Sequence, residues 1–345
     1  MRKLLFKLHL WVALIAGVFV LILGATGCIM AFEPEIDHLL HPHLSYVTPQ
    51  GRPLSLAEMG DRVGKAFPGE RIAAYTLSMS PDIAAQVNLR RGAVCINPYT
   101  GEILGVRPNG IDFLGYVHQL HLRLLLIRIR SDPGKKIMSW AGVVMLFLLL
   151  TGLYLWWPLK RVTVQSGKRF WFDLHNVTGI FSFAFLLILT VTGLLIGFEE
   201  TSVPMFYKIT GSEPSRPPAI PPPPSGAAPI SLDQAMEIAR AAIPGAAPFA
   251  INIPGPKGAY QVRSRFPEDL TPGGRSRVIV DQYTGKVLLT ESSRTAPAGT
   301  RMVIANRAIH TGDILGIPSK ALMSLASLMA VVQLITGLTM WWKRR

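Results

Sequence analysis

Four stretches without Asp, Glu, Lys or Arg constrain this chain more than any other feature of its sequence. They cover Trp11–Phe32, Ile137–Leu159, Asn176–Phe198 and Ala321–Trp342, and each contains 22 or 23 residues. A helix of about 20 apolar residues crosses the hydrocarbon core of a bilayer. The sequence therefore predicts four membrane-spanning helices, and the charged segments between them predict a large water-exposed part.

Basic residues flank these stretches and predict their orientation. The net charge of +14 also suits nucleic-acid binding, but the lysines and arginines gather at the ends of the apolar stretches. One group comprises Arg2, Lys3, Lys7, Lys160, Arg161, Lys168, Arg169, Lys343, Arg344 and Arg345. By the positive-inside rule, we expect both termini and the loop after the second stretch to lie in the cytoplasm. A second basic group is expected outside, at the membrane surface or facing an anionic ligand: Arg123, Arg128, Arg130, Lys135 and Lys136.

The sequence contains two matching halves in the same order. His9 lies 17 residues before Thr26-Gly27, and His175 lies 17 residues before Thr192-Gly193. The seven residues that begin at Thr151 match those that begin at Thr336, and both runs end in Trp-Trp. Each half is interpreted as a span, an outer module and a second span. Because both halves are expected to start in the cytoplasm, the repeat is parallel rather than inverted.

Each outer module is predicted to contain one helix followed by short strands. Ser55 with Glu58, and Ser231 with Gln234, have the spacing of a capping box, which opens a helix. Runs rich in strand-forming residues follow over 72–79, 86–90, 94–97, 249–253, 261–266 and 277–281. A Thr-Gly turn then precedes a last short strand in each half. These patterns predict two small α+β units.

Several motifs of the chain resemble those of the PepSY-associated transmembrane proteins. The resemblance rests on Tyr99-Thr-Gly101, Tyr283-Thr-Gly285, Leu120-His121-Leu-Arg-Leu124 and the Trp-Trp span ends, and it covers nearly the whole chain. The family comprises iron-regulated inner-membrane proteins of bacteria, some of which look like siderophore reductases that carry b-type haem. The resemblance implies a membrane bundle of four helices with two periplasmic α+β, PepSY-like modules.

The predicted domains follow the repeat. Residues 1–32 form the N-terminal span, 33–115 the first module, 116–159 a histidine-bearing pre-helix with span 2, 160–175 the cytoplasmic loop, 176–198 span 3, 199–300 a proline-rich linker with the second module, and 301–345 a second histidine-bearing pre-helix with span 4.

His9 and His175 are candidate ligands of a haem iron. They occupy equivalent positions in the two halves, and their equal spacing to Thr-Gly predicts equal depth in the membrane. Two imidazoles on facing helices can ligate a haem from opposite faces, which gives a low-spin, electron-transferring centre. The alternative is that each histidine is an interfacial residue whose ring reaches toward the headgroups.

A second pair, His121 and His310, precedes the inbound spans on the outer side. Together these residues predict a second haem near the outer surface. His118 competes with His121, because it lies three residues earlier on the same helical face. Arg123 and Arg307 are candidate partners for haem propionates, since arginine suits carboxylates.

Other polar residues near or within the spans are expected to be structural. His38, His41 and His43 with nearby acidic residues could bind a metal, but the second half has no counterpart, so we expect a solvated patch. The four Thr-Gly pairs are interpreted as packing sites that also leave room for a macrocycle. Gln333 is expected to bond a neighbouring helix.

Other enzyme classes find little support in the sequence. The chain contains no C-x-x-C, no phosphate-binding glycine loop, no G-x-S-x-G and no H-E-x-x-H, and no acidic residue lies within a predicted span. Together with the histidine pairs, the resemblance implies a haem-dependent ferric-siderophore reductase. No flavin or nicotinamide motif is present, so electrons are expected from a quinol or a cytoplasmic reductase. The alternatives are a haem-free, membrane-anchored module that binds a peptide or a protease, and a passive siderophore permease component.

Overall fold

The computed structural model describes residues 1–108, 112–126, 132–224 and 226–343. The chain forms two compact units, which we call the helical unit and the sheet unit. The helical unit comprises Met1–Glu33, Phe113–Ile209 and Met302–Arg345, and the sheet unit comprises Pro34–Asp112 and Thr210–Arg301. Each unit therefore contains segments from both halves of the sequence.

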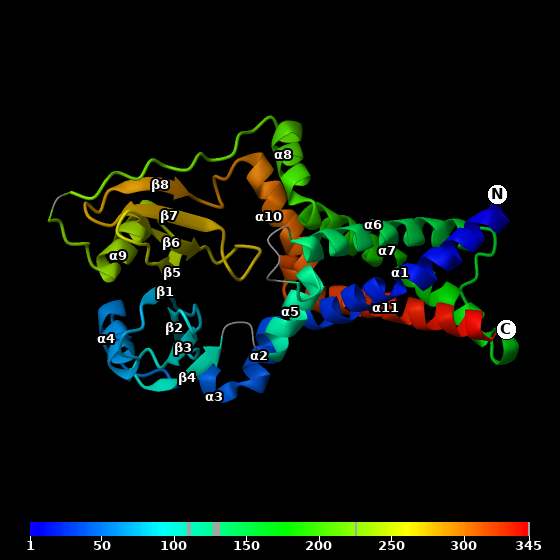
Figure 1. The fold of residues 1–345 in the computed structure, drawn as a ribbon, viewed down its shortest axis with the longest axis horizontal. Helices are drawn as coiled ribbons and strands as arrows, with labels where there is room; N and C mark the ends of the chain where they lie inside the picture. Colours follow the sequence, from blue (N-terminus) through cyan, green and yellow to red (C-terminus); the bar gives the residue numbers. More distant parts are fainter. Residues whose placement is uncertain (109–111, 127–131, 225, 344–345) are drawn as a thin grey trace. The chain divides into compact units, whose positions relative to one another are not determined.

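Four long helices build the helical unit (Figure 1). They are α1 (Arg2–Met30), α6 (Pro133–Trp156), α7 (Phe170–Gly197) and α11 (Ile317–Trp342). All four are long and apolar enough to cross a membrane, which confirms the four predicted spans. Each helix begins several residues before its charge-free stretch, and in α7 these residues include the buried Asp173, which pairs with Arg161 at 3.2 Å.

The four long helices pack as a ring. α1 contacts α6 and α11, and α7 contacts the same two helices. α1 and α7 therefore occupy opposite corners of the bundle. Between its two ends, Val20, Leu186 and Ala330 form a buried apolar cluster. Both chain ends and the loop between α6 and α7 lie at one end of the bundle (Figure 1).

Shorter helices accompany the bundle. α5 (Phe113–Arg123) packs against α1 and α6, α8 (Glu199–Thr210) follows α7, and α10 (Ala298–Thr311) precedes α11 through the short η2 (Asp313–Leu315). α2 (Glu33–Leu40) and α3 (Pro42–Ser45) follow α1, and η1 (Gly167–Arg169) precedes α7. The two pre-span helices, α5 and α10, carry the predicted outer histidines.

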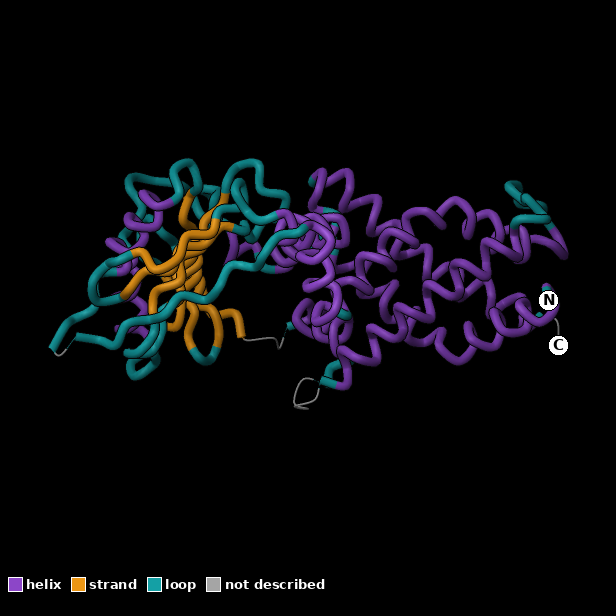
Figure 2. The backbone as a smooth tube through the Cα atoms, turned by 90° about the horizontal axis from the view of Figure 1, so that it is seen from above, coloured by secondary structure: helices purple, strands orange, loops and turns teal. Residues whose placement is uncertain are grey.

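The sheet unit contains one eight-stranded antiparallel sheet (Figure 2). Its strands are β1 (Ile72–Thr76), β2 (Ala85–Leu89), β3 (Gly92–Ile96), β4 (Ile103–Pro108), β5 (Ala247–Asn252), β6 (Ala259–Arg265), β7 (Ser276–Asp281) and β8 (Val287–Glu291). Each predicted β-rich run overlaps one of these strands. The spatial order β4-β3-β2-β1-β5-β6-β7-β8 joins two four-stranded meanders at β1 and β5.

The two predicted α+β units join edge to edge at this junction. β1 pairs with β5, and Tyr75 lies opposite Ile251. Both side chains belong to a single apolar core that contains residues from each half. The two modules merge because an isolated four-stranded sheet would leave this edge of unpaired backbone groups exposed.

Two capped helices cover one face of the sheet. In α4 (Leu56–Ala66) the Ser55 hydroxyl accepts from the Glu58 backbone N–H, and the Glu58 carboxylate accepts from the Ser55 N–H at 2.8 Å, as the capping-box pattern predicts. In α9 (Leu232–Ala242) the Ser231 hydroxyl accepts from the Gln234 backbone N–H at 3.1 Å. Asp233 also accepts from the Leu56 N–H at 2.8 Å, so a residue of one half caps the helix of the other.

The two faces of the sheet differ in chemistry. Val87, Tyr75, Ile251 and Val262 lie in one cross-strand row and belong to the buried core. Successive side chains of a strand point to opposite faces, so the neighbouring residues of these strands form the other face. That face carries four amide side chains: Gln86, Asn88, Asn252 and Gln261.

Candidate functional site

The predicted inner histidines lie on the helices at opposite corners of the bundle. His9 is on α1 and His175 is on α7. The His9 Nδ1 lies 2.8 Å from the Thr151 Oγ1 of α6, and the His175 Nδ1 lies 2.8 Å from the Thr336 Oγ1 of α11. Each inner ring is thus held by the neighbouring helix through one nitrogen, which leaves Nε2 as its other ring nitrogen.

The predicted outer histidines make the same contact from the short helices. The His121 Nδ1 of α5 lies 2.8 Å from the Thr26 Oγ1 of α1. The His310 Nδ1 of α10 lies 3.0 Å from the Thr192 Oγ1 of α7. All four Thr-Gly pairs therefore receive one histidine each. The sequence interpretation treated these pairs as packing sites and did not identify the threonines as histidine partners.

The glycine of each pair lies beside the same ring. A methyl group at Gly152 or Gly337 would lie 3.5 Å from the Cε1 of His9 or His175. At Gly193 it would lie 3.0 Å from the Cε1 of His310. The absence of a side chain therefore allows the imidazole to lie directly against the helix that carries its threonine.

The 17-residue spacing of the sequence separates two levels of the bundle. α1 carries His9 at the inner level and Thr26 at the outer level, and α7 carries His175 and Thr192 in the same way. At 1.5 Å per residue, 17 residues of helix extend over about 25 Å. The repeated spacing is thus the distance along the bundle between the inner and outer histidine pairs.

A cavity surrounds the inner pair. Its empty space is about 810 Å³, including the part that is open to the outside, and both His9 and His175 line it. The walls are mostly apolar, and several lining residues are small: Ala13, Gly17, Gly152, Gly179 and Ala330. A mostly apolar lining with a few polar side chains is typical of sites for cofactors and other small ligands.

Gln333 lines the same cavity and bonds a neighbouring helix, as the sequence predicts. Its amide Nε2 donates to the His175 carbonyl oxygen at 3.2 Å and to the Thr178 Oγ1 at 2.7 Å. Both acceptors belong to α7, so the contact ties α11 to α7 beside the inner histidine.

The outer histidines are half-buried, and their burial favours the neutral form. Burial is the largest cause that lowers the pKa of His121 to about 3 and that of His310 to about 4. The charges that His310 and His118 would carry lower the pKa of His121 further. A neutral imidazole is the form that ligates a metal ion.

The His118 side chain contacts a carboxylate, whereas that of His121 contacts a threonine. The His118 Nδ1 lies 3.0 Å from the Glu33 Oε2, and its side chain is 39% exposed. The hydrogen bond to Glu33 is the main cause that raises the pKa of His118. Of the two competing histidines, His121 is the one whose ring contacts the threonine of a Thr-Gly pair.

The predicted propionate partners lie near the outer pair but face solvent. The Arg123 Nε lies 3.3 Å from the Asp132 Oδ2, and the Arg123 side chain is 43% exposed. Arg307 is exposed, and its charge lowers the pKa of His310. Of the other outer basic residues, Lys135 pairs with Glu199, while Arg128 and Arg130 lie outside the described residues.

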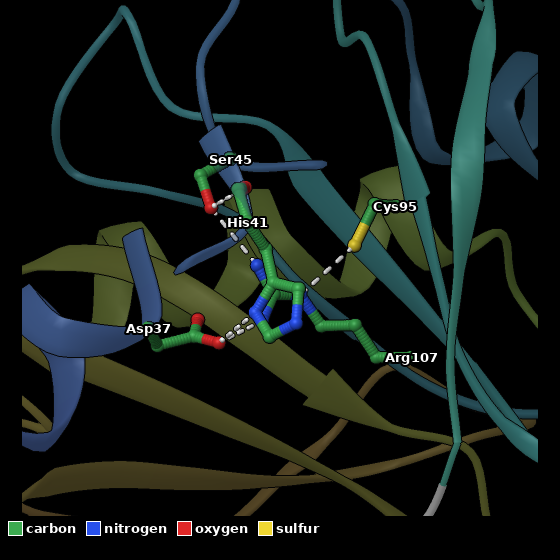
Figure 3. Close-up of polar contacts among 5 residues, drawn as sticks. All are labelled: Asp37, His41, Ser45, Cys95 and Arg107. Carbon is green, nitrogen blue, oxygen red and sulfur yellow. Dashed lines mark hydrogen bonds and ion pairs between the residues drawn. The ribbon is translucent and has the colours of Figure 1, made fainter. Parts of the chain in front are cut away.

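The histidine cluster after α1 divides among several partners. Asp37 binds both Arg107 and His41, while Arg107 also contacts Ser45 and the Cys95 sulfur (Figure 3). Glu33 instead contacts His118, and His38 packs edge-on against Tyr46. Among the described residues, no group of three or more His, Cys, Asp or Glu side chains converges on a possible metal position.

Comparison with known proteins places the chain in one family. No curated protein matches it. A family model described as the PepSY-associated TM region matches residues 6–344. The match extends over both units and all four long helices. The chain therefore belongs to the family of the PepSY-associated TM region.

Proposed function

We propose that this protein is an inner-membrane electron-transfer protein that holds two b-type haems, one between His9 and His175 and one between His121 and His310. The observation that carries the proposal is the common arrangement of these four histidines. Each ring is held by a threonine through Nδ1, so that Nε2 is the nitrogen left to act as a ligand.

The residues of the inner level fit a haem. The two imidazoles come from opposite corners of the bundle and line one cavity with apolar walls and small side chains. These walls would exclude water and the imidazoles would fix the orientation of the macrocycle. A bound haem would supply a one-electron Fe(III)/Fe(II) couple, and paired histidines favour electron transfer over oxygen binding.

The outer level fits through its half-buried, neutral histidines and their charged surroundings. His121 and His310 are held by equivalent threonines, Thr26 of α1 and Thr192 of α7. Arg307 lies nearby, and its guanidinium would suit a propionate or another carboxylate. Arg123 is the second such candidate, although it would have to exchange Asp132 for the new partner.

The proposed substrate is a ferric chelate, with a siderophore as the chelate suggested by the family resemblance. Hard oxygen donors bind Fe(III) far more tightly than Fe(II). One electron passed to the chelated Fe(III) would therefore weaken the complex and release Fe(II). The electron would come from a membrane quinol or a cytoplasmic reductase, since the sequence contains no flavin or nicotinamide motif.

The orientation is proposed from the basic flanks. Both chain ends and the short loop lie at one end of the bundle (Figure 1), where Trp157 and Trp342 are 62% and 75% exposed, as in an interfacial aromatic belt. This end would face the cytoplasm, and the sheet unit would lie in the periplasm. Reporter fusions after Lys168 and Lys343 should behave as cytoplasmic, and a fusion after Pro224 as periplasmic. A periplasmic signal after Lys343 would overturn this orientation.

A passive permease is less well supported, because Val20, Leu186 and Ala330, which line the inner cavity, form an apolar cluster rather than a polar path for a hydrophilic chelate. The haem-free binding module is the better alternative. The amide-rich face of the sheet favours it, because Gln86, Asn88, Asn252 and Gln261 can recognise polar ligands.

The absorption spectrum of the purified full chain tests the proposal. A Soret band, with sharp α and β bands after reduction by dithionite, is expected from low-spin haem with two histidine ligands. A variant that lacks all four histidines should be colourless. Wild-type protein that is made in a haem-replete cell and contains no haem would contradict the proposal and favour the binding module.

A further inference from the structure

The histidine contacts repeat one feature that the proposed function does not require. Every threonine that contacts a histidine also contacts the backbone of its own helix. Thr151 Oγ1 lies 2.7 Å from the Phe147 carbonyl oxygen, and Thr336 Oγ1 lies 2.8 Å from that of Val332. Thr192 Oγ1 lies 2.6 Å from the Ile188 carbonyl oxygen. Thr26 makes the same contact with Ile22.

The number of available protons determines which partner donates. A threonine hydroxyl has one proton, and a carbonyl oxygen can only accept. The hydroxyl must therefore donate to the carbonyl of its own helix, which leaves its lone pairs for the histidine. The histidine Nδ1 must then carry a proton and donate it to the threonine oxygen.

We infer that four threonines are positioning residues: Thr26, Thr151, Thr192 and Thr336. Each holds its histidine as the neutral Nδ1–H tautomer. The Nε2 lone pair is then directed away from the threonine before any ligand arrives. Because it assigns these lone pairs to haem iron, the inference rests on the proposed function, although the tautomer itself exists without haem. A neutral acceptor also suits this environment, since a carboxylate in its place would bring an uncompensated charge into the bundle.

The tautomer is measured on the full chain without added haem, in lipid nanodiscs and with ¹⁵N-labelled histidine. The ¹⁵N shifts of the two ring nitrogens distinguish the Nδ1–H form from the Nε2–H form. We expect four histidines in the Nδ1–H form, and each Thr→Val substitution should convert or mix the form of its own histidine only. Thr192→Val should therefore alter His310 and leave His9, His121 and His175 unchanged.

The chain offers a matched control on the same helix. Thr190 is also buried in α7, and its Oγ1 bonds the Leu186 carbonyl oxygen at 2.7 Å, but it contacts no histidine among the described residues. Thr190→Val removes the same hydroxyl from the same environment and should leave every tautomer unchanged. Thr192→Ser retains the hydroxyl and should keep His310 in the Nδ1–H form.

Haem titration provides a second measurement. Loss of a partner that orients a metal-ligating histidine typically costs about 10–100-fold in metal affinity. We expect a loss of this size at the outer site for Thr192→Val and little change for Thr190→Val or Thr192→Ser. Unchanged tautomers in all four Thr→Val variants, or an equal affinity loss in Thr190→Val, would overturn the inference. If the tautomers behave as expected but no variant binds haem, the positioning role stands and the proposed function fails.

Discussion

The inner and outer histidine pairs make the same hydrogen bond, but different elements carry them. The inner histidines lie on the long helices α1 and α7, and their threonines lie on the long helices α6 and α11. The outer histidines lie on the short helices α5 and α10, and their threonines lie on α1 and α7. The inner level is therefore built within the bundle itself, whereas the outer level depends on short helices docked at its end.

The surroundings of the two levels differ as well. The inner pair lines an apolar cavity, and Gln333 contacts the backbone beside it. The outer pair lies near the charged or titratable groups His118, Glu33 and Arg307. Under the proposed function, the inner level would receive electrons within the membrane and the outer level would pass them to a charged substrate.

The largest expected effect concerns the pairing at the inner level. His9→Ala and His175→Ala should each remove the inner haem or convert it to a high-spin form, because either change leaves the iron with one ligand. The double variant should lose no more haem than either single variant. Absorption and electron paramagnetic resonance spectra measure both quantities, and His41→Ala, a change in the sheet unit, is the control. Twice the loss in the double variant would show that the two histidines do not share an iron.

The next effect separates the roles of the two levels. Reduced protein mixed with a ferric siderophore should be reoxidised and produce Fe(II), which a ferrous chelator traps. His121→Ala together with His310→Ala should slow this reaction sharply while the inner haem stays in place. Arg307→Gln should slow it less, and mainly at low salt, because exposed charges act over a Debye length of about 10 Å at 0.1 M salt. Reoxidation at the wild-type rate in the double variant would contradict an electron exit at the outer level.

A smaller effect tests the cavity that distinguishes the inner level. Ala13 lines it, whereas Ile15 on the same helix is 76% exposed on the outside of the bundle. Ala13→Phe should fill part of the cavity and reduce haem occupancy at the inner site. Overpacking would make haem binding less favourable by about 1–3 kcal/mol. Ile15→Phe should leave occupancy unchanged. Equal occupancy in the two variants would show that the inner haem does not use this space.

The smallest effect concerns the titratable neighbour of the outer level. The hydrogen bond to Glu33 raises the pKa of His118, so the stabilisation from this pair is complete below the ordinary pKa of histidine. It is lost as the pH rises through the raised pKa. An NMR titration of His118 should give a lower pKa in Glu33→Gln than in the wild type. A pKa that does not change would mean that the contact is absent in solution.

Local features of the fold were predictable from the sequence. A charged residue is costly within a bilayer, so the four charge-free stretches located the four long helices. Capping is also local, and Ser55 and Ser231 begin α4 and α9 as their spacing predicts. Short runs rich in strand-forming residues located the strands. The candidate histidines were found because alignment of the two halves matches His9 with His175 and His121 with His310.

Only the tertiary structure showed what these local features contact. His121 and Thr26 are separated by 95 residues, and His310 and Thr192 by 118, so no helical or strand periodicity connects them. The pairing of β1 with β5 and the diagonal placement of α1 and α7 likewise depend on segments far apart in the chain. Periodicity, caps and the cost of buried charge act over a few neighbouring residues and are visible in the sequence. The partner of each Thr-Gly pair depends on how distant helices pack, and so it was decided in three dimensions.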